Sequence, residues 1–273
     1  MNSKKIKDRL DTFVDAILAI IATIMVLELP IKIVDKQIDF VNLFISIGVY
    51  LVSFCFLANV WYQHAVLFSE VEKVSEGIIL RELILVFFLS LMPTFTRLMT
   101  EDVISITVIL YGLLYLLIEF IFRWIAKDLI HSKYSNKSDM QKVYYSIYGK
   151  HNNEQTFLNI GLIFLALFLP KIALFLYLAI PIRSFLTIND DRTDFEEVGK
   201  MPTQGRKTYL DMSSKERVDF QKMMQQYRRQ IHSSAGNRAI REKAWNNFVK
   251  ESKKSFNINE DQLKDWFNRP ERH

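Results

Sequence analysis

Long apolar runs alternate with short polar segments over the first 189 residues of this chain. Six runs stand out, at 13–29, 40–62, 78–99, 104–126, 157–169 and 172–188. The first four have about the length that crosses a hydrocarbon core, which takes roughly 20 helical residues. The last two are shorter and are separated only by Pro170-Lys171, which predicts a tight helical hairpin. We therefore predict an all-α membrane protein with six transmembrane helices.

Lysine and arginine in the connections predict the orientation of these helices. The tail before residue 10 has four basic residues, and the connection at 127–155 has five lysines. The connections at 31–39 and 100–103 are balanced or acidic. Basic residues collect on the cytoplasmic side, so we expect a multi-pass protein of the cell (plasma) membrane with both termini in the cytoplasm. Asp15 would then lie at the cytoplasmic end of the first helix and Glu28 at its external end.

The character of the chain changes after Asn189. Residues 190–212 are polar and interrupted by glycine and proline, which predicts a linker between a transmembrane domain at 1–189 and a cytoplasmic helical module at 213–273. Ser213 and Glu216 have the spacing of a capping box at the start of a helix. Two further helices are predicted at about 237–255 and 260–268, with their apolar residues at helical spacing.

Composition and motifs exclude several classes of function. The net charge of +5 is too small to indicate a nucleic-acid interface. The single cysteine and the five scattered histidines have no partners at metal-ligand spacing, so neither a metal site nor a cofactor is expected. No HExxH, phosphate-binding loop or nucleophile elbow occurs, so the chain is not expected to be an enzyme. Glu119 and Arg123, four residues apart, are predicted to form a structural ion pair.

One face of the first helix carries an isolated hydroxyl. Ala16, Ile20, Thr23 and Leu27 share this face at helical spacing, and Thr23 lies near the middle of the membrane. Two interpretations fit. The face is a packing seam, since threonine is common at helix interfaces in membranes. Alternatively, several copies of the face meet on a symmetry axis and form a pore with an apolar constriction and a layer of hydroxyl dipoles.

The start of the first helix resembles a known family. Arg9, then three residues, then Phe13-Val14-Asp15 and "AILAIIATIMVLELP" resemble helix 1 of the transmembrane protein 175 family of potassium channels, whose pattern is a basic residue, three positions and Phe-Ser-Asp. Val14 departs from this pattern, because it stands where the family has serine.

The resemblance continues in order along the chain to about residue 187. "NVWYQHAVLF" resembles the end of the family's helix 2, with Trp61 and His64 three residues apart. "LRELILVFFLSLMPTFTRLM" resembles its helix 3, and "LALFLPKIALFLYLAIPI" resembles its closing hairpin. Residues 190–273 show no such resemblance.

The resemblance implies a potassium channel whose helix 1 lines a central pore without a re-entrant filter. Family members with a single six-helix unit form homotetramers. By position, Ile20 matches the family's apolar constriction, and Thr23 and Leu27 lie above it. The implied function is therefore a tetrameric potassium-permeable cation channel with modest selectivity for potassium over sodium. Its implied partners are copies of itself and the lipid bilayer, and its permeant ion is potassium.

The resemblance also implies a polar network at the cytoplasmic end of the pore. The network residues are Arg9, Phe13, Asp15, Trp61 and His64. Asp15 would be a paired structural carboxylate that holds the first helix against the second. Glu28 would form an acidic ring at the external mouth or, equally, a solvated carboxylate at the membrane interface.

Two other classes of function fit the sequence less well. A membrane-tethered signalling protein would act through the 213–273 module, whose Trp245, Trp266 and Phe267 would bind a cytoplasmic protein partner. These aromatic residues fit the module's own small core better, because a domain of this size needs its apolar residues for stability. A secondary transporter would show internal repeats and helices broken near the midplane, and the sequence shows neither.

Overall fold

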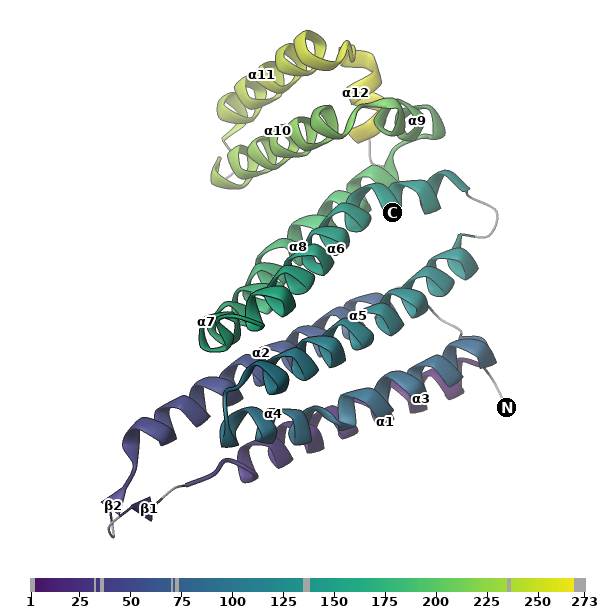
Figure 1. The fold of residues 1–273 in the computed structure, drawn as a ribbon. Coiled ribbons are helices and arrows are strands. Elements are labelled where there is room, and N and C mark those ends of the chain that lie inside the picture. Colours follow the sequence, from purple (N-terminus) through teal and green to yellow (C-terminus); the bar gives the residue numbers. More distant parts are fainter. Residues whose placement is uncertain are drawn as a thin grey trace. The chain divides into compact units, whose positions relative to one another are not determined.

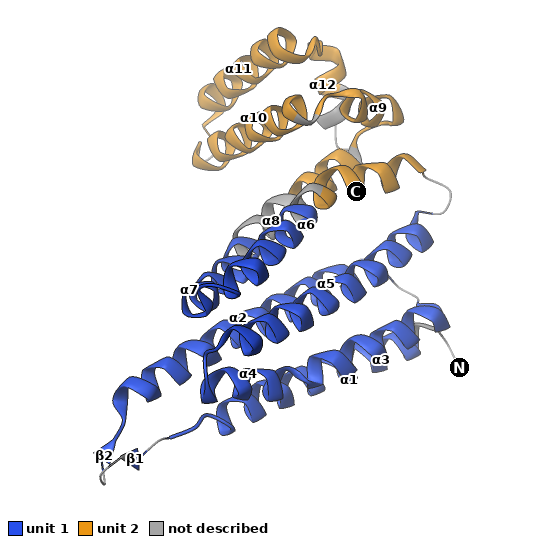
Figure 2. Ribbon diagram, in the orientation of Figure 1, with its two compact units in different colours: residues 1–135, 150–189 blue, residues 136–149, 190–273 orange. Residues whose placement is uncertain are grey.

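The computed structural model describes residues 3–31, 33–34, 37–69, 71, 74–134, 138–234 and 237–267, which are almost entirely helical (Figure 1). The chain divides into two compact units (Figure 2). Unit 1 comprises residues 1–135 and 150–189, and unit 2 comprises residues 136–149 and 190–273. Of the three boundaries between the units, those at 149/150 and 189/190 fall inside helices, namely α6 (Ser138–Ala166) and α8 (Ala179–Lys200).

Unit 1 contains the apolar runs of the sequence. Its remaining helices are α1 (Ser3–Leu27), α2 (Phe40–Ser69), α3 (Glu76–Ser90), α4 (Met92–Glu101), α5 (Ser105–Lys133) and α7 (Pro170–Tyr177). Within the described residues, four stretches are long and apolar enough to cross a membrane: 5–27, 40–69, 76–101 and 105–133. The predicted closing hairpin corresponds to the end of α6, α7 and the start of α8. A membrane protein with several spanning helices is therefore supported, whereas the count of six stays a prediction.

The third apolar run is divided into two helices. We expected one helix over residues 78–99, but α3 ends at Ser90 and α4 begins at Met92. Pro93 occupies the first turn of α4, where its missing N–H is tolerated. The proline thus explains why a single membrane-length run folds as two helices. A short antiparallel hairpin of β1 (Ile33–Val34) and β2 (Gln37–Ile38) connects α1 to α2, with Ile33 opposite Ile38.

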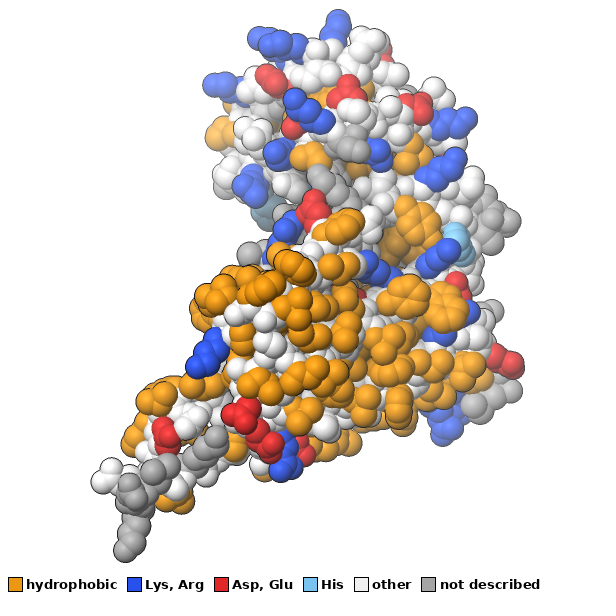
Figure 3. All heavy atoms as spheres, in the orientation of Figure 1, with side chains coloured by type: hydrophobic (Ala, Val, Ile, Leu, Met, Phe, Trp, Pro, Cys, Tyr) orange, Lys and Arg blue, Asp and Glu red, His pale blue; other side chains and the backbone are white. Residues whose placement is uncertain are grey.

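The core of unit 1 lies between α1, α2, α3, α4 and α5. α3 packs along α5, and α1 contacts α2, α3 and α4. The largest fully buried side chains of this core include Phe56, Phe68, Tyr111, Tyr115 and Tyr177. Other large apolar side chains, such as Phe87, Phe120, Phe164 and Phe175, are exposed, and hydrophobic atoms cover most of the visible face of unit 1 (Figure 3). Such an exposed apolar surface marks a membrane or protein contact.

Unit 2 is built from α9 (Thr203–Asp211), α10 (Ser214–Ser233), α11 (Arg238–Phe256) and α12 (Glu260–Phe267), with the start of α6 and the end of α8. Residues 190–212, which we expected to be a linker, form the end of α8 and all of α9. Phe195, Val198, Met201 and Tyr209 are buried there. The helical spacing of these apolar residues within a polar segment favours helices over a linker. Their burial stabilises the packing of the segment against its neighbours in unit 2.

The predicted cap of α10 is confirmed. The Glu216 N–H donates to Ser213 Oγ at 3.3 Å, and the Ser213 N–H donates to Glu216 Oε2 at 2.8 Å. Hydrogen bonding to the Ser213 side chain and to the Ser213 backbone N–H lowers the pKa of the Glu216 carboxyl. The helices predicted at 237–255 and 260–268 correspond to α11 and α12. The side chains of Trp266 and Phe267, named as candidate partner contacts, lie outside the described residues, whereas Trp245 is partly buried against Tyr227 and Phe248.

Candidate functional site

Helix α1 has one buried and one exposed face. Leu10, Val14, Leu18, Ile21 and Met25 are buried in the core of unit 1. The predicted pore residues lie on the other face, where Ile20 is 54 % exposed, Leu27 is 82 % exposed and Thr23 is also exposed. No other part of the described chain covers these three side chains. A face of this kind must contact lipid, another protein or a pore.

The orientation of the Thr23 hydroxyl favours the binding of a cation over the binding of an anion. Thr23 Oγ1 donates its proton to the backbone oxygen of Ile20 at 2.7 Å. A hydroxyl has a single proton and two lone pairs, so with this proton engaged the exposed oxygen can act only as an acceptor. The hydroxyl is therefore satisfied within α1 and still presents lone pairs on the exposed face.

The predicted polar network is divided into two parts. In the first, Trp61 Nε1 of α2 donates to Asp15 Oδ1 of α1 at 2.9 Å. This hydrogen bond connects the α1 motif to one of the predicted residues of α2. Arg9 and Phe13 are exposed, and at 100° per residue the Arg9 side chain points about 120° away from that of Asp15 around the helix axis. The basic residue of the motif therefore does not face its carboxylate.

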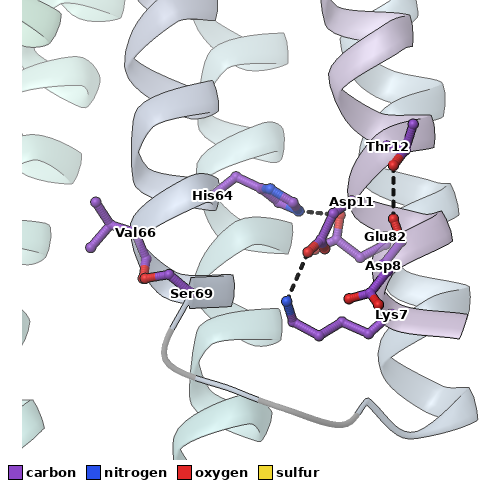
Figure 4. Close-up of polar contacts among 8 residues, drawn as sticks. All are labelled: Lys7, Asp8, Asp11, Thr12, His64, Val66, Ser69 and Glu82. Atoms are coloured by element: carbon purple, nitrogen blue, oxygen red, sulfur yellow. Dashed lines mark hydrogen bonds and ion pairs between the residues drawn. The ribbon is translucent and has the colours of Figure 1, made fainter. Parts of the chain in front are cut away.

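The second part of the network is buried and includes a residue that the sequence reasoning missed. His64 Nε2 lies 3.4 Å from Glu82 Oε2 of α3, with the side chains 3 % and 0 % exposed. The His64 ring stacks on Phe68 with centroids 4.1 Å apart. Figure 4 also shows Asp11 of α1, which accepts a hydrogen bond from Lys7 of the same helix at 2.8 Å. The pair of His64 and Glu82 thus joins α2 and α3.

The sequence itself indicates that Glu82 is buried. Ile78, Glu82, Leu85 and Leu89 follow one another at i, i+4, i+7 and i+11, so Glu82 occupies the buried apolar stripe of α3. A carboxylate at such a position needs a partner, because an unpaired buried charge is costly. Periodicity therefore predicts that Glu82 is buried, but only the packing of α2 against α3 identifies His64 as its partner.

Val14 and Glu28 occupy very different environments. Val14, at the position where the resembling family has serine, is 1 % exposed and belongs to the apolar core. It contributes packing where a serine would need a hydrogen bond. Glu28 follows the last residue of α1 and is partly buried, and its backbone N–H bonds to Ile24 O at 3.0 Å.

Comparison with known families gives one match within the membrane region. Residues 9–93 match the family described as "Endosomal/lysosomal potassium channel TMEM175". A potassium channel of Chryseobacterium sp. (strain P1-3) is 40 % identical over 91 residues, which is 33 % of this chain and 47 % of the relative. The chain therefore spans about half the length of this curated relative.

Comparison with solved structures identifies the same fold. The crystal structure of a lysosomal potassium-selective channel TMEM175 homolog from Chamaesiphon minutus superposes with a TM-score of 0.56 and 19 % sequence identity. The match covers 68 % of this chain and 99 % of that chain. At this identity the likeness concerns the fold, and it extends beyond the residues matched by sequence.

Proposed function

We propose that this chain, for which the comparisons support the TMEM175 potassium channel family rather than an enzyme, is a potassium-permeable cation channel whose pore is lined by α1. In this proposal, four copies assemble in the cell membrane with both termini in the cytoplasm. The exposed faces of four α1 helices then surround the axis of the tetramer.

The observation that carries the proposal is the division of α1 into two faces. The helix is anchored by a buried stripe, and the opposite stripe of Ile20, Thr23 and Leu27 is exposed. Around a symmetry axis, four Ile20 side chains would form an apolar constriction that conducts only when wetted. Four Thr23 hydroxyls, with their protons turned toward the helix, would offer oxygen lone pairs to a partly dehydrated potassium ion. Because hydroxyls replace a cage of carbonyl groups, we expect modest selectivity for potassium over sodium.

The matched substitutions Ile20→Asn and Leu113→Asn test this proposal. Both replace an exposed aliphatic side chain of a membrane helix, but Leu113, 50 % exposed, belongs to α5. In proteoliposomes, Ile20→Asn should raise potassium flux several-fold by wetting the constriction, whereas Leu113→Asn should leave it unchanged. Thr23→Ala should keep the flux but bring the potassium-to-sodium ratio closer to one.

Equal potassium flux in Ile20→Asn and the unmodified protein would show that Ile20 is not the constriction. Native mass spectrometry provides the second arm, since a species other than a tetramer would contradict the proposed assembly. If α1 faces lipid instead, Ile20→Asn and Leu113→Asn should have the same effect.

A further inference from the structure

Basic residues are concentrated in the two packed helices α10 and α11 of unit 2. Residues 214–256, which contain both helices, have eleven Lys and Arg against four Asp and Glu, a net charge of +7 that exceeds the +5 of the whole chain. On the visible face of unit 2, Lys and Arg side chains are frequent and hydrophobic side chains are sparse (Figure 3). These two helices are therefore the strongly positive part of unit 2.

One side of α11 is buried, and another side carries lysines. Ala244, Phe248 and Ser252 are buried in unit 2. Four exposed residues at i, i+4, i+7 and i+11 form a stripe on the same helix: Lys243, Asn247, Lys250 and Lys254. We call these four residues the lysine stripe. It is about 16 Å long, and at 100° per residue its centre lies about 130° around the helix from the centre of the buried side.

The charge of the lysine stripe is little compensated by neighbouring carboxylates. Side chains three or four residues apart meet on a helix surface, and no acidic residue lies at that distance from Lys243 or Lys250. Lys253, which precedes the last member of the stripe, adds another exposed ammonium group. The stripe is therefore a positive surface that is open to an anionic partner.

α10 carries a second basic stripe that is partly compensated. Its exposed members are seven residues apart: Lys215, Lys222 and Arg229. Asp219 lies four residues after Lys215 and three residues before Lys222, so its carboxylate offsets part of their charge. The α10 stripe therefore provides a control with the same number of basic side chains as the lysine stripe.

The chemistry of the lysine stripe favours a diffuse anionic surface over a single bound phosphate or a nucleic acid. Its charges are all ammonium groups, which act as point charges, whereas the arginine fork is the group that binds phosphate in a bidentate manner. The stripe also has no aromatic side chain on which a base could stack. Trp245 of the same helix is only partly exposed and packs against Phe248, with ring centroids 6.0 Å apart.

We propose that the lysine stripe docks unit 2 on the anionic headgroups of a lipid bilayer. α6 and α8 pass directly from the membrane-spanning unit 1 into unit 2, so the chain itself supplies the bilayer at a high effective concentration. Each lysine near an anionic leaflet raises the ratio of docked to free module roughly fivefold. This attraction is screened within about 10 Å at 0.1 M salt, so the docking is sensitive to salt.

Lysine acetylation of the full chain in lipid nanodiscs tests the docking. Nanodiscs of phosphatidylcholine are compared with nanodiscs of equal parts phosphatidylcholine and phosphatidylglycerol, and mass spectrometry gives the acetylation rate of each lysine. Lys243, Lys250 and Lys254 should react about threefold more slowly, or slower still, in the anionic nanodiscs. Lys207 of α9 and Lys222 of α10, which are exposed in the same unit, should react equally in both. Molar salt should abolish the difference.

Two triple variants that lose the same charge provide a matched comparison. They are Lys243→Gln/Lys250→Gln/Lys254→Gln in the lysine stripe and Lys215→Gln/Lys222→Gln/Arg229→Gln in the α10 stripe. Lys253 is retained in both variants, so its acetylation reports the docking. Its protection in anionic nanodiscs should be lost in the first variant and retained in the second. All six residues are exposed, so both variants should unfold at the temperature of the unmodified protein.

Equal acetylation of the lysine stripe in the two kinds of nanodisc would overturn the docking. Equal loss of Lys253 protection in both triple variants would overturn it as well, because the charge of the whole unit and not one face would then be responsible. Protection by an added DNA duplex, without protection in anionic nanodiscs, would identify a nucleic acid as the partner instead. The proposed potassium pore is judged separately, because it is tested by potassium flux.

Discussion

At the scale of single residues, His64 and Glu82 each depend on the other for a polar partner inside the core. Both are almost fully buried, and their closest atoms are 3.4 Å apart. Removing one member of a buried pair leaves the other without compensation, which commonly costs about 3–5 kcal/mol. The pair therefore fixes α2 against α3 even though its own net contribution to stability is small.

We expect Glu82→Ala to destabilise the protein by about 3 kcal/mol, because the polar His64 ring loses its buried partner. Thermal unfolding of the purified protein in detergent measures the change. Glu76→Ala is the control, since Glu76 is an exposed residue of the first turn of the same helix and its loss should cost less than about 1 kcal/mol. Similar unfolding temperatures for the two variants would mean that His64 and Glu82 do not stabilise each other.

At the scale of elements, the contact of α5 with α7 depends on one glycine. A Cβ on Gly112 would lie 2.6 Å from Ile163 Cγ1 and closer still to the Tyr177 hydroxyl. Gly112 has ordinary helical geometry, so it is needed for this close approach and not for its conformational freedom. The absence of a side chain lets α5 and α7 approach closely enough for Tyr177 to pack on Tyr111.

Gly112→Ala should destabilise unit 1 by about 1–3 kcal/mol through overpacking, and it should break the hydrogen bond between Tyr177 and Asn159. Gly48→Ala is the matched control, because no atom lies within 4 Å of the added Cβ. Its helix propensity should make that variant as stable or more stable by up to about 1 kcal/mol. Unfolding in a denaturant series compares the two variants. Equal free energies of unfolding would show that α5 and α7 can separate without a loss of stability.

At the scale of the whole molecule, unit 2 is not a simple C-terminal appendage. The start of α6 belongs to it, and Met140, Val143 and Ile147 are buried there. Arg206 connects its segments, since it donates to Asp139 Oδ2 at 2.5 Å, to Thr203 at 3.2 Å and to the backbone oxygen of Met201. A deletion beginning at residue 190 would therefore uncover apolar residues of α6, and one beginning at 203 retains α8.

The ion pair of Asp139 and Arg206 should make unit 2 sensitive to acid. Partial burial alone would raise the pKa of the Asp139 carboxyl, but the hydrogen bond and charge of Arg206 lower it below its ordinary value. The folded state therefore binds this proton more weakly than the unfolded state does. The stabilisation is complete well above the unfolded value of about 4 and is lost as the pH falls through the folded value.

We expect Asp139→Asn to weaken unit 2 by about 1–2 kcal/mol at pH 7, and the difference from the unmodified protein to shrink as the pH falls from about 4 to 3. Hydrogen exchange of residues 138–147 and 203–211 in the full chain measures the free energy of opening. Glu251→Gln, an exposed change on α11, should have no effect at either pH. A difference that stays constant with pH would show that the ionised carboxylate is not the stabilising group.

Local sequence patterns predict many of the helices of this protein. Membrane-length apolar runs specify α1, α2 and α5, because every backbone group in a bilayer must be paired within a helix. The Ser213 capping box and the spacing of Glu119 and Arg123, whose charged atoms lie 3.7 Å apart as predicted, act within one or two helical turns, so they can be read without a fold. The face of Ile20, Thr23 and Leu27 also follows from helical spacing alone, and the structure adds that this face is uncovered.

Other features depended on contacts between helices that are distant in sequence. Periodicity could place Glu82 inside, but only the packing of α2 on α3 supplied His64, and only the packing of α1 on α2 supplied Trp61 for Asp15. The buried hydrogen bonds of Thr96 with Ser53 and of Tyr177 with Asn159 likewise join separate helices. The polar 190–212 segment is mostly helical because Phe195, Val198 and Tyr209 are buried within unit 2. Sequence fixes which face of a helix is apolar or polar, whereas the tertiary structure decides which groups meet there, because pairing energy depends on distance and burial.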